Sequence, residues 1–175
     1  SPAQTLHLDH CELWINPTNP DHIAVGNDGG LYVSYDKGDN WLHHNNIPAG
    51  EFYDITLDNQ KPYNIYGGVQ DDATVYGPAK EWDASRTDQW KYLWIDPWSG
   101  GDGCVTEVDP DDPNTVYFSR RHGDGLRKDM AADTSKTIGP SRTKISKENK
   151  LRYNFVSPYI ISPHNSKTLY HGSNH

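Results

Sequence analysis

The stretch Ile23–Trp41, which reads IAVGNDGGLYVSYDKGDNW, decides the fold of this chain. It contains two short apolar segments, Ile23–Val25 and Leu31–Val33, separated by the polar turn Asn27–Gly30. An Asn-Asp-Gly-Gly turn between two such segments predicts a β-hairpin. A second turn, Ser34–Trp41, has the spacing S-x-D-x-G-x-x-W. Its Asp can bond to the backbone two residues on, its Gly can supply a positive φ, and its Trp can fold back as an apolar plug.

The second turn resembles the Asp-box, also called the bacterial neuraminidase repeat, of β-propeller proteins. Proteins that carry this box include sialidase-like, xyloglucanase-like and sortilin-like propellers. The resemblance rests on Ser34, Asp36, Gly38 and Trp41 at the spacing of the box. Because the box is a structural turn that recurs among unrelated activities, it implies a fold rather than a function.

Internal repeats extend the pattern over the whole chain. Segments that align without gaps are Ile15–Gly26, Leu57–Gly68, Val108–Phe118 and Ile161–Gly172. Each reads as a strand, a turn rich in Pro, Asn and Asp, and a second strand. The equivalent turn positions recur at intervals of about 42, 51 and 53 residues, which suits four-stranded propeller blades.

The repeats predict an all-β chain forming a single β-propeller segment over residues 1–175. We expect about three and a half blades, at approximately 6–45, 51–95, 103–155 and 156–175. In the second blade, strands are predicted at 52–57, 64–69, 74–76 and 90–95. The polar, basic region 133–150 predicts a mobile loop or insertion in place of a fourth strand in the third blade. Since half a ring exposes strand edges, we expect the remaining blades in a longer protein, or another copy of the chain, to complete it.

Further motifs resemble a group of sialidase/sortilin-like propeller proteins of the glycosyl hydrolase type. The motifs are Glu51–Asp58, Pro62–Asp72, Gly100–Gly103, Val108–Pro110 and Pro163–Gly172, and together they span most of the chain. The resemblance implies a carbohydrate-active propeller that acts on or binds glycans. The sequence leaves the location open and favours a secreted protein, extracellular or periplasmic. The resemblance equally allows a non-catalytic, sortilin-like propeller that binds peptides or proteins, or a scaffold fragment with no site of its own.

Composition narrows the choice of partners. The chain carries 11 Tyr, 6 Trp, 15 Gly and 12 Pro in 175 residues, which suits short strands joined by many turns. Its formal net charge of −8 argues against nucleic acid and anionic membranes as partners. No apolar run approaches the roughly 20 residues of a transmembrane helix. The two cysteines, Cys11 and Cys104, are interpreted as buried thiols, with a disulfide or a reactive thiol as alternatives.

Propeller geometry predicts where a site lies. Strands alternate in direction within a blade, so the loop entering the first strand and the loop between the second and third strands share one face. Candidate catalytic residues on that face are Asp28, Asp71, Asp72, Asp102 and Asp124. Candidate substrate-binding residues are His7, Asp9, His10, Gln70, Trp98 and His122.

Several chemistries fit this acidic face. Two carboxyl groups can act as acid and base on a glycosidic bond. Asp with carbonyl oxygens can hold Ca²⁺, and Asp with His can hold a transition metal, although no cofactor is required. The alternative is that Asp-Gly and Asn-Asp-Gly are simply the residues that such turns need. A sialidase brings several Arg together on its substrate, but strand alternation sends Arg120 and Arg121 to opposite faces, which argues against that activity.

Overall fold

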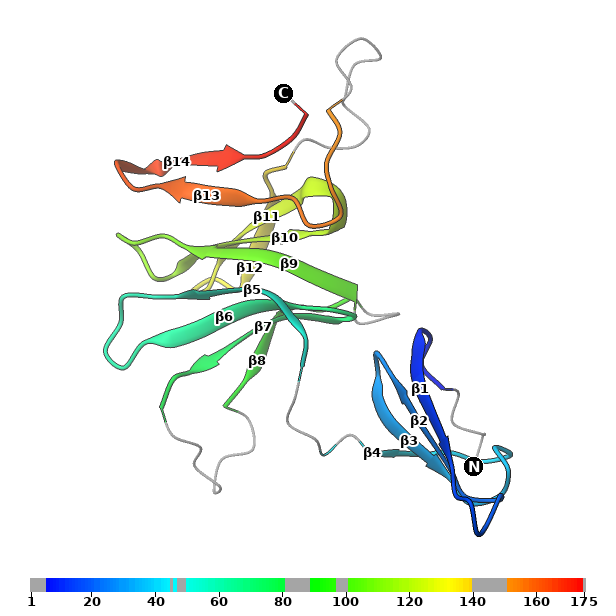
Figure 1. Cartoon of the computed structure of the whole chain (residues 1–175). Helices are drawn as coiled ribbons and strands as arrows, with labels where there is room; N and C mark the ends of the chain where they lie inside the picture. The colour runs from blue at the N-terminus through cyan, green and yellow to red at the C-terminus, as the bar shows by residue number, and fades with distance from the viewer. Residues whose placement is uncertain are drawn as a thin grey trace. The chain divides into compact units, whose positions relative to one another are not determined.

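A computed structural model describes residues 6–44, 46, 50–80, 89–96, 101–139 and 151–174 (Figure 1). The chain divides into two compact units, Ser1–Ala49 and Gly50–His175. The prediction of an all-β chain is confirmed, because the only helical element in the described part is the short 3-10 helix η1 (Arg121–Gly123). None of the described residues belongs to a helix of the length and apolarity that a membrane crossing requires.

The first unit is an antiparallel sheet built in chain order. Its strands are β1 (His10–Ile15), β2 (Ile23–Asn27), β3 (Gly30–Ser34) and β4 (Leu42–His44). The β2–β3 hairpin closes through the expected turn, with Asn27 opposite Gly30. The Asn27 side chain accepts a hydrogen bond from the amide of Gly29 at 2.9 Å. The hairpin signal in the sequence therefore sets the register of the sheet.

The turn after β3 is held by side chains at the spacing of the box. Ser34, which is 1% exposed, accepts a hydrogen bond from the Gly38 amide at 2.8 Å and donates one to Asp36. Asp36 in turn accepts hydrogen bonds from the backbone and side-chain nitrogens of Asn40 at 2.8 and 2.7 Å. Gly38 has a φ of +96°, and the Trp41 ring lies against it. Each named residue of the motif thus has a structural task in this turn.

The second unit contains three groups of strands. The first group is β5 (Phe52–Leu57), β6 (Asn64–Val69), β7 (Asp72–Pro78) and β8 (Lys91–Trp94). The second is β9 (Gly101–Val108), β10 (Thr115–Arg120), β11 (Asp124–Asp129) and β12 (Thr134–Thr137), and the third is β13 (Tyr159–Ser162) with β14 (Asn165–His171). Each group is antiparallel in chain order, and a short parallel pairing of β7 with β9 joins the first two.

Strand β12 lies within the region 133–150, for which the sequence predicts a loop or insertion. It pairs with β11 from Leu126↔Thr137 to Asp129↔Thr134 and gives the second group its fourth strand. All four residues of β12 are polar and exposed, so the strand carries no hydrophobic alternation in its sequence. Residues 140–150 lie outside the described part of the chain.

The core lies between the first two groups of strands. It is formed by Tyr66, Leu93, Val108, Val116 and Phe118. Here β6 approaches β9 so closely that a β-carbon on Gly68 would lie 2.1 Å from the carbonyl oxygen of Cys104. Glycine at this position therefore permits the contact between two backbones that positions the start of β9.

The equivalent turns of the four repeats each contain a hydrogen bond of the same kind. In each, a side-chain oxygen accepts a hydrogen bond from the backbone nitrogen two residues on. The pairs are Asn16 with Thr18, Asp58 with Gln60, Asp109 with Asp111, and Ser162 with His164. The repeat seen in the sequence is thus a repeat of local structure. Strands β5, β9 and β13, each the first of its group, also lie in succession in the second unit (Figure 1).

Candidate functional site

Buried Asp102, at the start of β9, organises a polar cluster at one end of the second unit. The residue is only 5% exposed. Its Oδ1 accepts hydrogen bonds from the Tyr53 hydroxyl at 3.4 Å and from the backbone nitrogen of Asp71 at 3.2 Å. Its Oδ2 lies 3.5 Å from a terminal nitrogen of Arg121. A buried carboxylate needs such partners, and Asp102 uses both oxygens to hold three segments together: β5, the turn before β7 and η1.

The Arg121 guanidinium faces solvent beside aromatic rings. Its side chain is 57% exposed, although one nitrogen is anchored by Asp102. The guanidinium carbon lies 6.0 Å from the ring centre of Phe155, which is itself 40% exposed. Tyr53 and His122 each form a T-shaped pair with the Phe155 ring, with centroid separations of 6.1 and 5.6 Å. The cluster therefore presents a fixed cation and an exposed aromatic ring side by side.

Left-handed backbone occurs at three non-glycine residues around Asp102. Asp71, Ala73 and His122 have φ values of 52°, 74° and 60°. Ala73 is fully buried and pairs with Asp102, while the His122 amide donates a hydrogen bond to the Phe155 carbonyl at 2.9 Å. Such conformations are costly for residues with a β-carbon and often occur at functional sites. The three residues with left-handed backbone therefore lie at or beside the polar cluster around Asp102.

The charge of Asp102 shapes the acidity of its neighbours. Burial raises the pKa of the Tyr53 hydroxyl to about 12, and the nearby Asp102 carboxylate adds to the effect. Burial also raises the pKa of the Cys104 thiol to about 12, again with a contribution from Asp102. Both groups stay protonated at neutral pH, so Tyr53 serves as a hydrogen-bond donor and Cys104 is an inert thiol.

The other acidic candidates of the second unit have different surroundings. Asp72 keeps contact with solvent, but partial desolvation raises the pKa of its carboxyl against the opposing effect of a hydrogen bond from Tyr92. Asp124 forms an ion pair with Arg120, whose guanidinium lies 5.1 Å from the Trp94 ring centre. Arg120 and Arg121 therefore contact different carboxylates.

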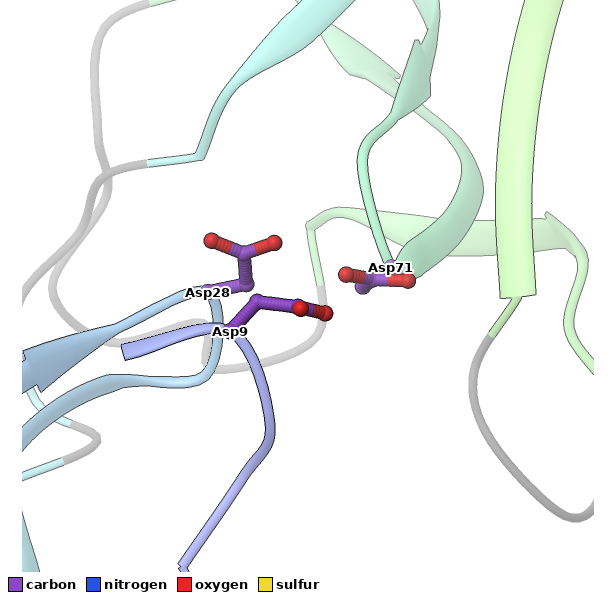
Figure 2. A group of neighbouring side chains, drawn as sticks. All are labelled: Asp9, Asp28 and Asp71. Atoms are coloured by element: carbon purple, nitrogen blue, oxygen red, sulfur yellow. The ribbon is translucent and has the colours of Figure 1, made fainter. Parts of the chain in front are cut away.

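In the first unit, Asp9 and Asp28 come from two adjacent loops (Figure 2). Each offers a carboxylate oxygen within 4.8 Å of the other. Asp9 has a φ of 58°, and the Cys11 thiol lies 4.0 Å from Asp28. Two carboxylates at this spacing are suitable oxygen ligands for a hard cation. Asp71, also labelled in Figure 2, belongs to the second unit, where its amide contacts Asp102.

The remaining substrate-binding candidates make separate contacts in the two units. Asn27 donates a hydrogen bond to the His7 carbonyl at 3.2 Å, and its amide nitrogen lies 3.5 Å from His10 Nδ1. In the second unit, the Gln70 amide donates a hydrogen bond to the Glu51 carbonyl at 2.9 Å. Trp98 lies outside the described residues.

The structure thus brings Asp71, Asp102 and His122 into one cluster, and Asp9 and Asp28 into another. Three members of the Asp102 cluster were not predicted: Tyr53, Arg121 and Phe155. Only their positions in the sequence could have identified Tyr53 and Arg121 as site residues. Tyr53 follows Glu51 at the entrance of a strand, and Arg121 directly precedes His122. Both cysteines are free thiols, and Cys11 is exposed where a buried thiol was expected.

Comparison with known proteins assigns no family and no function to the chain. The chain matches no protein-family model. A search of curated proteins likewise finds no significant match. The case for function therefore rests on the residues themselves.

Proposed function

We propose that the chain is a segment of an Asp-box β-propeller that binds glycans through the Asp102 cluster, formed by Tyr53, Asp71, Asp102, Arg121, His122 and Phe155. The observation that carries the proposal is the exposed guanidinium of Arg121, held by buried Asp102 beside the exposed ring of Phe155. Sugar hydroxyls accept hydrogen bonds from a guanidinium, and the C–H face of a pyranose packs on an aromatic ring. A few fixed polar groups beside an apolar surface are typical of a ligand site.

Support for the propeller comes from the strand groups of the second unit. They follow one another in chain order, and their turns share the same side-chain hydrogen bond. The group β5–β8 also exposes the large apolar residues Phe52, Ile55, Leu57 and Tyr92, and Trp90 is exposed directly before β8. An apolar sheet face of this kind is what a propeller blade buries against its neighbour. The box-type turn between β3 and β4 is a further feature of these proteins.

Glycan binding is tested first on an array of defined oligosaccharides, with a peptide library printed beside them. Any oligosaccharide that binds is then titrated by calorimetry into the intact chain and into three variants, R121Q, F155A and K167Q. Removing a charged hydrogen-bond donor costs about 1.5–3 kcal/mol, so we expect R121Q to bind about tenfold or more weakly. K167Q removes the same charge from an exposed position on β14 and should bind normally. Binding of peptides alone, or equal affinity of R121Q and the parent chain, contradicts the proposal.

Hydrolysis is a second candidate, favoured by the raised pKa of the Asp72 carboxyl. A carboxyl with a raised pKa keeps its proton to higher pH than an ordinary Asp, and contact with solvent lets it reach a substrate, as a general acid on a glycosidic bond requires. On this hypothesis the intact chain releases reducing sugar from a glycan that it binds. D72N should then lower turnover by about 10²–10⁴-fold without weakening binding. Binding without any release of sugar identifies the chain as a binder.

A further inference from the structure

A cavity at the end of β14 lies next to the Asp102 cluster. It is lined by residues of the segment 152–158, which precedes β13, and by residues 172–174, which follow β14. Its volume is about 470 Å³, within the range of small-molecule sites. The side chains in its lining that can form hydrogen bonds are those of Arg152, Tyr153, Asn154, Ser157, Ser173 and Asn174. The only charge among them is the cation of Arg152.

The cavity and the Asp102 cluster share a wall. Asn154 lines the cavity, and the next residue is Phe155 of the cluster. The ring of Tyr153 lies against Gly123 of η1, where a β-carbon would be 2.6 Å from Cγ of the ring. Gly123 directly follows His122, which forms a T-shaped pair with Phe155. Consecutive Cα atoms are about 3.8 Å apart, so Tyr153 and Phe155 leave the backbone within about 7 Å of each other. Neighbouring residues of one saccharide chain can therefore contact both.

The wall is held in place by contacts on both of its sides. The Tyr153 ring stacks on His171 of β14, with 4.7 Å between the ring centres. The backbone nitrogen of Arg152 donates a hydrogen bond to Asn174 Oδ1 at 2.6 Å, and the Asn174 amide donates one to the Arg152 carbonyl at 3.2 Å. The Ser157 hydroxyl donates to the Asn154 carbonyl at 2.8 Å. These bonds join the two sides of the cavity, so it is formed before a ligand arrives.

Polar groups in the lining are available to a ligand. Among the described residues, neither the Tyr153 hydroxyl nor the side-chain amide of Asn154 has a hydrogen-bond partner. Gly123 meets the Tyr153 ring at its Cγ end, so the hydroxyl lies at the end away from η1. Burial raises the pKa of this hydroxyl, so it stays protonated at neutral pH and can donate a hydrogen bond. Amides and hydroxyls of this kind are suitable partners for the hydroxyl groups of a sugar.

We propose that this cavity binds a second sugar residue of the glycan whose first residue packs on Phe155 beside Arg121. The ligand is then an oligosaccharide rather than a monosaccharide. This inference rests on the proposed function of the Asp102 cluster and specifies the ligand of that same site. The first residue meets a cation and an apolar ring, and the second meets mainly neutral hydrogen-bonding groups.

The test is calorimetric titration of the intact chain with an oligosaccharide that binds on the array, and with its monosaccharide and disaccharide fragments. A neutral hydrogen bond is worth about 2–10-fold in affinity, so the disaccharide should bind about tenfold or more tightly than the monosaccharide. S173W places an indole in the lining of the cavity and should remove this advantage without weakening the monosaccharide. Y153F keeps the ring and should weaken the disaccharide about 2–10-fold. Y170F is the matched control, because it removes the hydroxyl of an exposed tyrosine of β14, and it should bind normally.

R121Q separates this inference from the proposed function, because it should weaken the monosaccharide and the disaccharide alike. If no glycan binds, both fail. If R121Q weakens binding but the parent chain binds the monosaccharide and the disaccharide equally, only the cavity inference is overturned. The same conclusion follows if S173W and Y153F bind the disaccharide as the parent chain does. Circular dichroism, together with an unchanged affinity for the monosaccharide, establishes that S173W is folded.

Discussion

Replacing Gly68 with alanine tests the packing that positions β9, and with it Asp102. A β-carbon at this position would lie 2.1 Å from the Cys104 carbonyl oxygen and 2.4 Å from the carbonyl carbon of Gly103. An ordinary contact between carbon and oxygen is about 3.3 Å or longer, so β6 and β9 must separate by about 1 Å. Both atoms belong to the backbone, so no side chain can rotate away to make room.

The expected loss of stability follows from two opposing effects. Overpacking a well-packed interior costs about 1–3 kcal/mol and occasionally more, and a contact between two backbones falls at the upper end. Alanine also restricts the unfolded chain, which offsets about 0.4–1 kcal/mol. We therefore expect G68A to lower the free energy of unfolding of the second unit by about 2 kcal/mol or more.

The repeat supplies the matched control. Gly26 occupies the equivalent position on β2, but among the described residues the nearest atom to a β-carbon there belongs to the Glu12 side chain, at 4.0 Å. G26A should therefore be neutral or slightly stabilising. Urea unfolding followed by hydrogen–deuterium exchange of peptides from β2, β6 and β9 separates the two units. If G68A unfolds at the same urea concentration as the parent chain, the inference that β6 packs too closely on β9 to admit a β-carbon at position 68 is wrong.

Three further predictions concern single side chains. S34A removes the acceptor for the Gly38 amide and should cost the first unit about 1–3 kcal/mol in urea unfolding, whereas an unchanged midpoint would show that the turn does not need this hydroxyl. Burial, followed by the charge of Asp54, raises the folded-state pKa of Glu107 to about 7, so the stability of the second unit should fall as pH rises from about 4.5 to about 7. E107Q should make the stability of the second unit less dependent on pH in this range, and an unchanged slope would contradict the role of Glu107. Burial lowers the pKa of His171, whose Nε2 has no partner among the described residues, so stability should also fall as pH drops below about 6.5. H171F should remove this acid-sensitive step in thermal unfolding.

Much of the fold is predictable because its signals are local. The bounds of β5 and β6 coincide with the predicted segments 52–57 and 64–69. Pro, Asn and Asp determine the turns through bonds that reach only two residues along the chain. Strand β12 could not be found in this way, because its sequence is uniformly polar and its pairing with β11 is tertiary.

The candidate site was predictable only in part, for the same reason. Strand direction predicts that the loops carrying Asp71, Asp102 and His122 share one face, and the structure joins them through hydrogen bonds and the Phe155 ring. Phe155 itself follows a polar region, and nothing in its neighbourhood in the sequence signals contact with Tyr53. Contacts between sheets join residues that are far apart in the sequence and leave no local sequence pattern. Residues that complete a site through such contacts therefore cannot be predicted from the sequence.

The contacts of Asp102 favour binding over catalysis by this residue. Oδ1 accepts two hydrogen bonds and Oδ2 faces Arg121, so attack on a substrate by either oxygen first requires breaking contacts that hold three segments of the chain together. A nucleophile or base needs a free lone pair directed at the substrate. Arg121 is in the opposite situation, because one nitrogen is anchored while most of the side chain faces solvent. The buried acid therefore acts by orienting an exposed cation, and Arg121 with Phe155 is the part of the cluster available to a ligand.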